Sequence, residues 1–427
     1  MSLRTIAHLC RSRRNLFLGS SDLERMQILK LRKMLTFAYN NVPFYHEKLK
    51  KVGLKPDDIQ TLDDLGKVPL TTKTDIQNTP LKNMVTGNVE VDKCVKNRTS
   101  GSTGISLTTL AGKETDDFDQ TMWLRAYFLN GMHLRDKRVV FRDLTAHPEL
   151  LTHKSWVGRF GIMRRKYVSI FDDSRTQTKI LAEEKPGIIE SYPSSLAIIA
   201  DLHSDDIVNV RPRLVFTLAE FLDRRSRELI TTAFQTELFD YYGSAEIGLM
   251  SWECKRHWGY HINADNVIME FINENGETLE PGKTGEIVCT NLYNYEMPMI
   301  RYKHGDIGTT IVENCTCGVR LPLMKIVGGR KDDFLRTTDG RAVPPTVFFP
   351  FPFEDFEKIR QFRVIQETRN KLRIQLVVKQ SFDTCLFEKA RKKIQRVFGQ
   401  DMEVEFEILE HLARDRSGKL RKIISRI

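Results

Sequence analysis

Residues 98–104 read Arg-Thr-Ser-Gly-Ser-Thr-Gly, a run of hydroxyl side chains and glycines with no residue large enough for a core. Glycine lets the backbone approach a ligand closely, and Ser and Thr hydroxyls donate hydrogen bonds suited to phosphate oxygens. The run is not a Walker A loop, because Ile105 and Ser106 follow Gly104 where that motif has Lys and Ser or Thr. By itself it also fits a flexible Ser/Gly linker, so the sequence downstream decides its role.

The chain has 427 residues, of which 41% are hydrophobic, and this predicts a large buried core divided between two domains. No apolar run approaches the ~18 residues of a membrane span. The arginine-dotted N-terminus lacks the apolar centre of a signal peptide, so we expect a cytoplasmic protein that does not bind membranes. A net charge of +10 favours anionic partners such as nucleotides or coenzyme A. Because the basic residues are scattered, nucleic acid is not expected.

Hydrophobic periodicity predicts helices at 21–51 and 115–129, followed by alternating strands and helices. The strands are expected at 138–141, 168–171, 188–190 and 214–217, and the helices at 177–184, 194–202 and 223–234. This alternation is typical of an α/β domain with a mostly parallel sheet.

From residue 240 onward the pattern changes to short strands and turns. Strands are expected at 267–272, 285–290, 299–302 and 308–312, which together suggest a small antiparallel β sub-barrel. After residue 333, strands at 362–366, 371–378 and 404–409 and a helix at 386–398 indicate a small α+β domain.

Several of these stretches together resemble the adenylate-forming superfamily. Within it, they resemble the phenylacetate-CoA ligase branch, which includes CapK-type and coenzyme F390 synthetase-like proteins. The resemblance runs over nearly the whole chain and rests on the order and spacing of short motifs. These are Val42-Pro43-Phe44-Tyr45, Thr99 to Gly104, Tyr242-Gly243-Ser244-Ala245-Glu246, Arg301 to Asp306, Gly329-Arg330-Lys331-Asp332-Asp333 and Ser417-Gly418-Lys419.

The resemblance implies an N-terminal AMP-binding domain over residues 1–331 and a mobile C-terminal domain over residues 332–427, with Asp332 as the hinge. It implies that a carboxylic acid attacks the α-phosphate of ATP to give an acyl-adenylate and pyrophosphate. The thiol of coenzyme A then displaces AMP. The expected partners are thus a small-molecule carboxylic acid, ATP and coenzyme A with Mg²⁺, and a homodimer is left open.

The resemblance also assigns roles to particular residues. Lys419 would bridge the carboxylate and the α-phosphate, Arg330 would contact ribose or phosphate, and Glu246 offers the hard oxygen that Mg²⁺ prefers. Tyr242 would stack on adenine, and Asp306 could accept hydrogen bonds from both ribose hydroxyls. The other residues expected to line the nucleotide site are Thr99, Ser100, Gly101, Ser102, Thr103, Gly104, Ala219, Glu220, Tyr241, Gly243, Ser244 and Ala245.

Two positions depart from the family pattern. Leu218 stands where the family usually has glycine before Ala219 and Glu220. After Gly104 the family often has Lys or Thr followed by Pro, so a cation that would touch pyrophosphate is missing here, and Arg98 is a candidate to replace it.

The seven cysteines are odd in number and unevenly spaced, which argues against a disulfide framework. Cys254, Cys315, Cys317 and His261 are ligands of the type that Zn²⁺ selects, and four of them would close a structural site within residues 250–320. This arrangement is frequent in the phenylacetate-CoA ligase branch. His257 is the alternative to His261, while Cys289 and Cys385 are expected to be ordinary buried thiols on apolar strands.

The sequence thus predicts an ATP-dependent, AMP-forming acid:CoA ligase whose acid, with an aromatic acid among the candidates, is not specified. Two alternatives remain open. One is an adenylating enzyme whose acceptor is an amine, a hydroxyl or a carrier-protein thiol, and the other is a non-catalytic nucleotide-binding homologue.

Overall fold

The computed structural model describes residues 3–98, 107–145, 150, 158, 160–203, 206–207, 209–330, 333–348, 358–379 and 382–427. Contacts divide the chain into two units, each built from two segments that are distant in sequence. The first comprises Met1–Met132 and Tyr241–Ile326, and the second comprises His133–Asp240 and Val327–Ile427. None of the helices in the described ranges is both long and apolar enough to cross a membrane. The expected boundary between residues 331 and 332 stays a prediction.

The first unit begins with helices that pack on one another. They are α1 (Leu3–Asn15), α2 (Ser20–Asn41), α3 (Pro43–Lys51), α4 (Lys73–Asn78), α5 (Leu81–Met84) and α6 (Lys113–Leu129). The helical segment expected at 21–51 is confirmed as two helices, because Pro43 lacks an N–H and begins α3 instead of continuing α2. The apolar face of α2 is buried as its periodicity predicts, with Leu31, Met34, Leu35 and Ala38 inaccessible to solvent.

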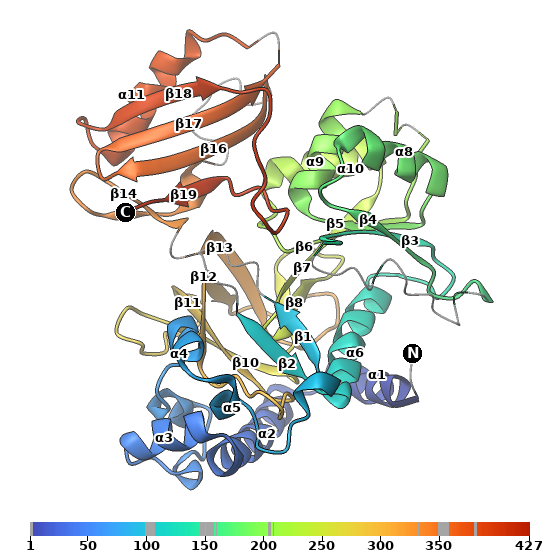
Figure 1. Ribbon diagram of the computed structural model, residues 1–427, viewed down its shortest axis with the longest axis vertical. Coiled ribbons are helices and arrows are strands. Elements are labelled where there is room, and N and C mark those ends of the chain that lie inside the picture. The colour runs from blue at the N-terminus through green and yellow to red at the C-terminus, as the bar shows by residue number, and fades with distance from the viewer. Residues whose placement is uncertain are drawn as a thin grey trace. The chain divides into compact units, whose positions relative to one another are not determined.

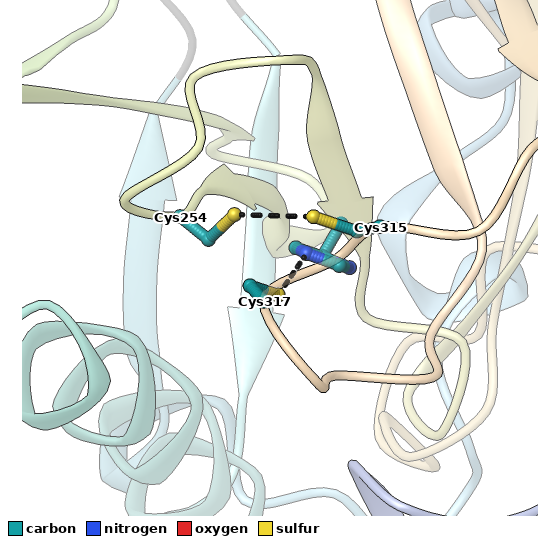
Figure 2. A group of neighbouring side chains, drawn as sticks. Cys254, Cys315 and Cys317 are labelled. Atoms are coloured by element: carbon teal, nitrogen blue, oxygen red, sulfur yellow. Dashed lines mark hydrogen bonds between the residues drawn. The ribbon is translucent and has the colours of Figure 1, made fainter.

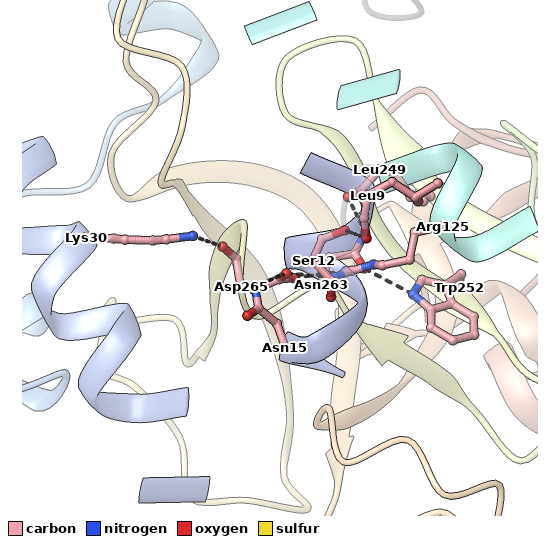
Figure 3. A network of polar contacts seen from close by, with 9 residues as sticks. All are labelled: Leu9, Ser12, Asn15, Lys30, Arg125, Leu249, Trp252, Asn263 and Asp265. Carbon is pink, nitrogen blue, oxygen red and sulfur yellow. Dashed lines mark hydrogen bonds and ion pairs between the residues drawn. The ribbon is translucent and has the colours of Figure 1, made fainter. Parts of the chain in front are cut away.

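A buried polar network ties these helices to a turn far along the chain (Figure 3). The guanidinium of Arg125, on α6, donates to both carboxylate oxygens of Asp265 at 2.6 and 2.9 Å, and both side chains are only 1% exposed. Asn15, at the end of α1, donates to the same carboxylate at 2.9 Å, and Lys30 on α2 donates to the backbone carbonyl of Asp265. The network supplies partners for a buried ion pair that would otherwise be costly to desolvate.

The first unit also contains antiparallel strands. Strand β1 (Val95–Arg98) pairs with β2 (Thr108–Ala111), so these strands flank the predicted phosphate loop; Thr99 to Gly104 themselves lie outside the described residues. The larger sheet runs in the order β10 (Val267–Ile272), β11 (Thr284–Asn291), β12 (Tyr302–Ile311), β13 (Leu323–Arg330), β9 (Tyr260–Ile262), β8 (Gly248–Glu253) and β7 (Glu237–Ser244).

One prediction in this region is wrong in detail. The two short strands expected at 299–302 and 308–312 are replaced by the single strand β12. Gly305 lies within β12 at φ +88°, a conformation that glycine adopts without the steric cost that other residues carry. The strand therefore continues through a glycine that, in the sequence, looks like a turn.

The second unit has the predicted parallel sheet. Strands β6 (Leu214–Leu218), β5 (Ile188–Ser191), β3 (Arg138–Arg142) and β4 (Arg165–Ser169) lie in that order, and each adjacent pair is parallel. Helices α8 (Ser174–Glu184), α9 (Pro193–Leu202) and α10 (Arg224–Phe234) bury their apolar faces in the same core as the strands. Strands β5 and β6 are buried almost along their whole length because both faces of a parallel sheet are covered.

The C-terminal residues of the second unit form a small sheet in the order β18 (Glu403–Ile408), β17 (Lys371–Val378), β16 (Ile359–Thr368) and β19 (Ile423–Ser425). Helix α11 (Leu386–Phe398) lies along this sheet and buries Ala390, Ile394 and Phe398 against it (Figure 1). A short hairpin of β14 (Leu335–Arg336) and β15 (Ala342–Val343) precedes it. The α/β class with a small C-terminal sheet is confirmed. Cys385 is a correction, since it is exposed at the start of α11 and not buried on a strand.

Candidate functional site

In the first unit, the Tyr241 to Glu246 motif forms the end of β7 and the turn into β8. Tyr241 pairs with Trp252, and Ser244 pairs with Gly248, so Glu246 lies in the turn of a hairpin. Gly243 is required here, because a Cβ at this position would lie 2.7 Å from the carbonyl oxygen of Gly248. The hairpin thus gives the motif a tightly packed backbone.

The structure brings Tyr242 and Asp306 together. The Tyr242 hydroxyl donates to Oδ2 of Asp306 at 2.7 Å, and Nδ1 of His304 lies 2.8 Å from the same oxygen. Nδ1 of His304 also lies 3.1 Å from the Tyr242 hydroxyl. Asp306 was expected to bind ribose, and its carboxylate is held in place by both neighbours. No pattern in the sequence selects His304 as a partner of this carboxylate.

Glu246 has a partner of its own. The hydroxyl of Tyr302, on β12, donates to Oε1 of Glu246 at 3.0 Å. The turn that carries Glu246 is fixed by two further bonds, from Thr109 Oγ1 to the carbonyl of Ala245 and from the Ile247 amide to Oγ of Ser244. A carboxylate held in this way is suited to binding a hard cation such as Mg²⁺.

A carboxylate that sequence reasoning missed supports the other side of this turn. Asp119, on α6, accepts a hydrogen bond from the Leu249 amide at 3.2 Å and lies against Gly248. Burial raises the pKa of Asp119 to about 6, although the Leu249 hydrogen bond opposes the shift. No local pattern selects this residue, because its partner is 130 residues away along the chain.

In the second unit, Ala219 and Glu220 follow the carboxyl end of β6. Ala219 adopts φ +72°, a strained conformation for a residue with a Cβ. The carboxylate of Glu220 accepts hydrogen bonds from the amide and the hydroxyl of Ser194, both at 3.0 Å, and from the Leu420 amide at 2.7 Å. This edge of a parallel sheet is where α/β proteins bind ligands.

The residue next to Leu420 is Lys419, which lies in a tight loop organised by Asp415. Oδ1 of Asp415 accepts from the Ser417 amide at 2.8 Å, from the Ser417 hydroxyl at 2.6 Å and from the Lys419 amide at 3.0 Å. Gly418 has φ +79°, and a Cβ there would lie 2.4 Å from Cγ2 of Ile170. The backbone that carries Lys419 is therefore closely fixed.

The remaining expected residues are divided between the described and undescribed parts of the chain. Arg330 is the last residue of β13. Asp332 lies outside the described residues, as does the phosphate loop. Beside the hinge position, Asp333 forms an ion pair with Arg421 at 2.5 Å. Arg98 is exposed at the end of β1, next to the phosphate loop in sequence.

The expected metal ligands meet in one cluster of the first unit (Figure 2). The ligand atoms of Cys254, His261, Cys315 and Cys317 all lie within 4.8 Å of one another. The Sγ atoms of Cys254 and Cys315 are 3.6 Å apart, and Sγ of Cys317 lies 3.3 Å from Nε2 of His261. A tetrahedral zinc ion with Zn–S bonds of about 2.3 Å needs separations of this order.

The surroundings of the cluster also fit a metal. Nδ1 of His261 lies 3.2 Å from the carbonyl oxygen of Leu321, which leaves Nε2 directed toward Cys317. Burial lowers the pKa of His261, which favours the neutral imidazole that binds metals. Burial raises the pKa of Cys254 to about 12, and a bound cation would reverse this by stabilising the thiolate.

His257 is not part of the cluster. Its backbone is in the left-handed region at φ +50°, and its Nδ1 lies 3.5 Å from the carboxylate of Glu253. Of the two histidines left open by the sequence, the structure selects His261. A backbone amide, that of Val319, donates to Sγ of Cys317 at 3.4 Å, as is common around ligating thiolates.

Comparisons with known proteins identify chains to which this one is similar. The profile described as the CapK C-terminal domain matches residues 335–426. The phenylacetate-coenzyme A ligase of Thermus thermophilus is 26% identical over 341 residues, which cover 74% of this chain and 72% of that protein. Protein CapK of Staphylococcus aureus is 24% identical over 426 residues, which cover 95% of this chain and 90% of CapK.

The chain is similar to the phenylacetate-CoA ligase and CapK branch of the adenylate-forming superfamily. The chain is an acid–CoA ligase-like, adenylate-forming enzyme, and the resemblance noted from the short motifs is confirmed. The solved structure of a 2-hydroxyisobutyryl-CoA ligase in complex with 2-HIB-AMP has the same fold, with a TM-score of 0.78 at 18% identity. That comparison covers 97% of this chain and 91% of the ligase.

Proposed function

We propose that the protein activates a carboxylic acid with ATP, forms an acyl-adenylate with release of pyrophosphate, and transfers the acyl group to the thiol of coenzyme A. The observation that supports this best is the loop of Lys419, whose neighbour Leu420 bonds to Glu220 at the carboxyl end of β6. Distant homology to phenylacetate-CoA ligases supports the same class of activity.

In the first half-reaction, a carboxylate oxygen of the acid attacks the α-phosphorus of ATP. The bond between that phosphorus and the bridging oxygen to the β-phosphate breaks, and pyrophosphate leaves with the electron pair. Negative charge increases on the α-phosphate oxygens in the transition state, and the ammonium group of Lys419 would neutralise it. Arg330 is a second cation proposed for the phosphate or the ribose.

The nucleoside half of ATP would bind to the first-unit residues. The carboxylate of Asp306 would accept from ribose hydroxyls, and the ring of Tyr242 would pack on adenine. Glu246, oriented by Tyr302, would hold Mg²⁺, which when bound supplies positive charge next to the phosphates.

In the second half-reaction, the sulfur of coenzyme A attacks the acyl carbonyl carbon, and AMP leaves from it. The thiol proton is lost to solvent or to a basic group as the C–S bond forms. Coenzyme A is anionic, which suits a chain with a net charge of +10.

A second candidate keeps the adenylation step and changes the acceptor to an amine, a hydroxyl or a carrier-protein thiol. The observation that leaves the acceptor open is the extent of the alignments, because the relative that covers most of the chain is described only as protein CapK. The phenylacetate-CoA ligase aligns with 74% of this chain, whereas CapK aligns with 95%, and the family profile on residues 335–426 is that of CapK.

We also propose that Cys254, His261, Cys315 and Cys317 bind one structural Zn²⁺. The four protein ligands would fill a tetrahedral site and leave no position for water, so the metal would stabilise the fold and take no part in the chemistry.

Pyrophosphate release from ATP, measured with a panel of aromatic and aliphatic carboxylic acids, tests the adenylation step. Each acid is assayed with and without coenzyme A, and the products are identified by mass spectrometry. We expect acid-dependent pyrophosphate release and an acyl-CoA product. Acyl-AMP that accumulates in the presence of coenzyme A would favour another acceptor, and no pyrophosphate with any acid would refute the proposal.

A further inference from the structure

The carboxylate of Glu220 connects two segments of the second unit that are 200 residues apart. Oε1 accepts from the Leu420 amide at 2.7 Å and from the Ser194 hydroxyl at 3.0 Å, while Oε2 accepts from the Ser194 amide at 3.0 Å. Three donors thus converge on one half-buried carboxylate. Such charge-assisted bonds are roughly twice as strong as neutral ones.

A second set of bonds runs from the same serine to the other side of the Lys419 loop. The guanidinium of Arg414 donates to the Ser194 hydroxyl at 3.1 Å and to the carbonyl of Gly418 at 2.8 Å. It also donates to the Ser195 hydroxyl at 3.3 Å. Arg414 and Leu420 flank Lys419, so the loop is held from both sides by the start of α9 and by Glu220.

Local geometry explains why Glu220 occupies this position. Helix α9 begins with Pro193, and its N-cap residue Tyr192 makes no side-chain cap among the described residues. The N-terminal amides of a helix favour a negative charge, which the carboxylate of Glu220 supplies. The left-handed backbone of Ala219 precedes it, and strain of this kind is retained where the surrounding structure requires it.

Other contacts attach the C-terminal residues to the same unit without touching the loop. Lys422 forms an ion pair with Asp223 at 2.5 Å, and Arg360 lies 3.3 Å from Asp201. Loss of the Glu220 bonds would therefore loosen the loop without detaching the C-terminal sheet. A variant of Glu220 can therefore test whether this side chain holds the Lys419 loop, separately from the attachment of the C-terminal sheet.

We propose that Glu220, acting through Ser194 and Arg414, is a positioning residue that fixes the Lys419 loop for adenylation and must release it before thioester formation. The inference rests on the proposed function, in which Lys419 acts only in the first half-reaction. It assigns the Glu220 side chain to the loop, in addition to the adenine-lining role that the family resemblance implies for this segment.

The first test is independent of activity. Hydrogen exchange of the Leu420 amide is measured by mass spectrometry in the wild type, in Glu220→Ala and in Ser194→Ala, without substrates. We expect exchange at residues 414–420 to become at least about tenfold faster in Glu220→Ala, the equivalent of one lost charge-assisted hydrogen bond. Exchange in β16 and β17 should not change. Unchanged exchange at Leu420 would overturn the proposal even if the enzyme proved inactive with every acid.

The second test separates the half-reactions. In Glu220→Ala, kcat for pyrophosphate exchange should fall about tenfold while KM for ATP stays within about twofold, and transfer from supplied acyl-AMP to coenzyme A should not fall. Glu220→Gln keeps one acceptor and should restore part of the exchange rate. Ser194→Ala removes the hydroxyl but keeps the backbone amide that donates to Glu220 at the start of α9. It should lower pyrophosphate exchange and spare transfer to coenzyme A in the same way, to a smaller extent.

Glu184→Ala is the matched control, because Glu184 forms an ion pair with Lys137 in the same unit. Among the described residues, no hydrogen bond or ion pair joins Glu184 to residues 414–420. It should not separate the half-reactions. A raised KM for ATP with unchanged kcat in Glu220→Ala would show that the side chain binds nucleotide instead. An equal loss in both half-reactions would show that it only supports the fold.

Discussion

The hydroxyl of Tyr242, on β7, donates a hydrogen bond of 2.7 Å to the carboxylate of Asp306, on β12. The two residues belong to motifs that are 64 residues apart, and both were assigned to nucleotide binding. The orientation of the Asp306 carboxylate therefore depends on the Tyr242 hydroxyl. The ring of the same tyrosine is proposed to pack on adenine.

Replacing Tyr242 with Phe keeps the ring and removes this donor. We expect KM for ATP to rise about tenfold, because Asp306 loses one of the bonds that orient it toward ribose, with a smaller change in kcat. Steady-state pyrophosphate exchange measures both constants. Tyr295→Phe is the control, since the Tyr295 ring packs edge-on against Phe37 away from Asp306. An unchanged KM for ATP would count against the role of Asp306.

Lys419→Ala should abolish most adenylate formation, by about 10²- to 10³-fold, because the charge that develops on the α-phosphate loses its cation. Thioester formation from supplied acyl-AMP should be largely retained. Single-turnover assays of each half-reaction measure the two effects. Lys392→Ala, on the exposed face of α11, should change neither rate. A normal rate of pyrophosphate exchange in Lys419→Ala would remove the lysine from the mechanism.

The purified protein should contain about one zinc ion per chain, as expected for four ligands at one site. Metal analysis should show that Cys315→Ser/Cys317→Ser loses it, while the exposed Cys385→Ser retains it. Chelation should lower the thermal midpoint, because a structural metal contributes directly to folding. Zinc retained by the double variant would disprove the ligand set.

Asp265→Asn should lower the free energy of unfolding by about 3–5 kcal/mol, because it leaves the buried guanidinium of Arg125 without its anion. Denaturant unfolding at pH 7 measures the loss, with the exposed Asp57→Asn as a control.

The same pair predicts how stability depends on pH. Burial alone would raise the pKa of Asp265, but the Arg125 charge, the hydrogen bonds from Arg125 and Asn15 and the Lys30 charge together outweigh burial and hold that pKa below its usual range. The stabilisation is therefore present above the unfolded pKa of about 4 and is lost as the pH falls through the lower folded value. The difference between wild type and Asp265→Asn should shrink below about pH 4. A constant difference would show that the carboxylate is not ionised in the fold.

Asp332→Pro tests the proposed hinge. Proline fixes φ at about −65° and removes the N–H, so it should lock one of two backbone states. We expect one half-reaction to be largely kept and the other lost, with little change in stability. Equal loss in both half-reactions would contradict a rotating C-terminal domain.

Local patterns predicted most of the second unit. The expected strand at 214–217 and helix at 223–234 differ from β6 and α10 by one residue at an end, because their apolar spacing matches one structure only. The patterns failed at Gly305, where the backbone of β12 continues through a residue that usually indicates a turn. A glycine can either end a strand or lie within it, and spacing does not distinguish these cases.

The candidate site also contains residues that could be selected from the sequence and residues that could not. The cysteines and His261 could be selected because their chemistry restricts what they bind. Asp119 and Arg414 could not, because their roles come from partners 130 and 220 residues away and from burial that no local pattern indicates. Residues that position others are recognised only after the fold brings their partners together.

The Arg125–Asp265 network also has a consequence for the biosynthesis of the protein. Arg125 and Asp265 are 140 residues apart in the sequence. Asn15 on α1 and Lys30 on α2 also find their hydrogen-bond acceptors at Asp265. At roughly 5–20 residues per second, Arg125 leaves the ribosome on the order of ten seconds before Asp265. During that interval the N-terminal helices carry polar groups whose native partners have not been made. Completion of the first unit must therefore wait until translation has passed the whole of the second unit's first segment.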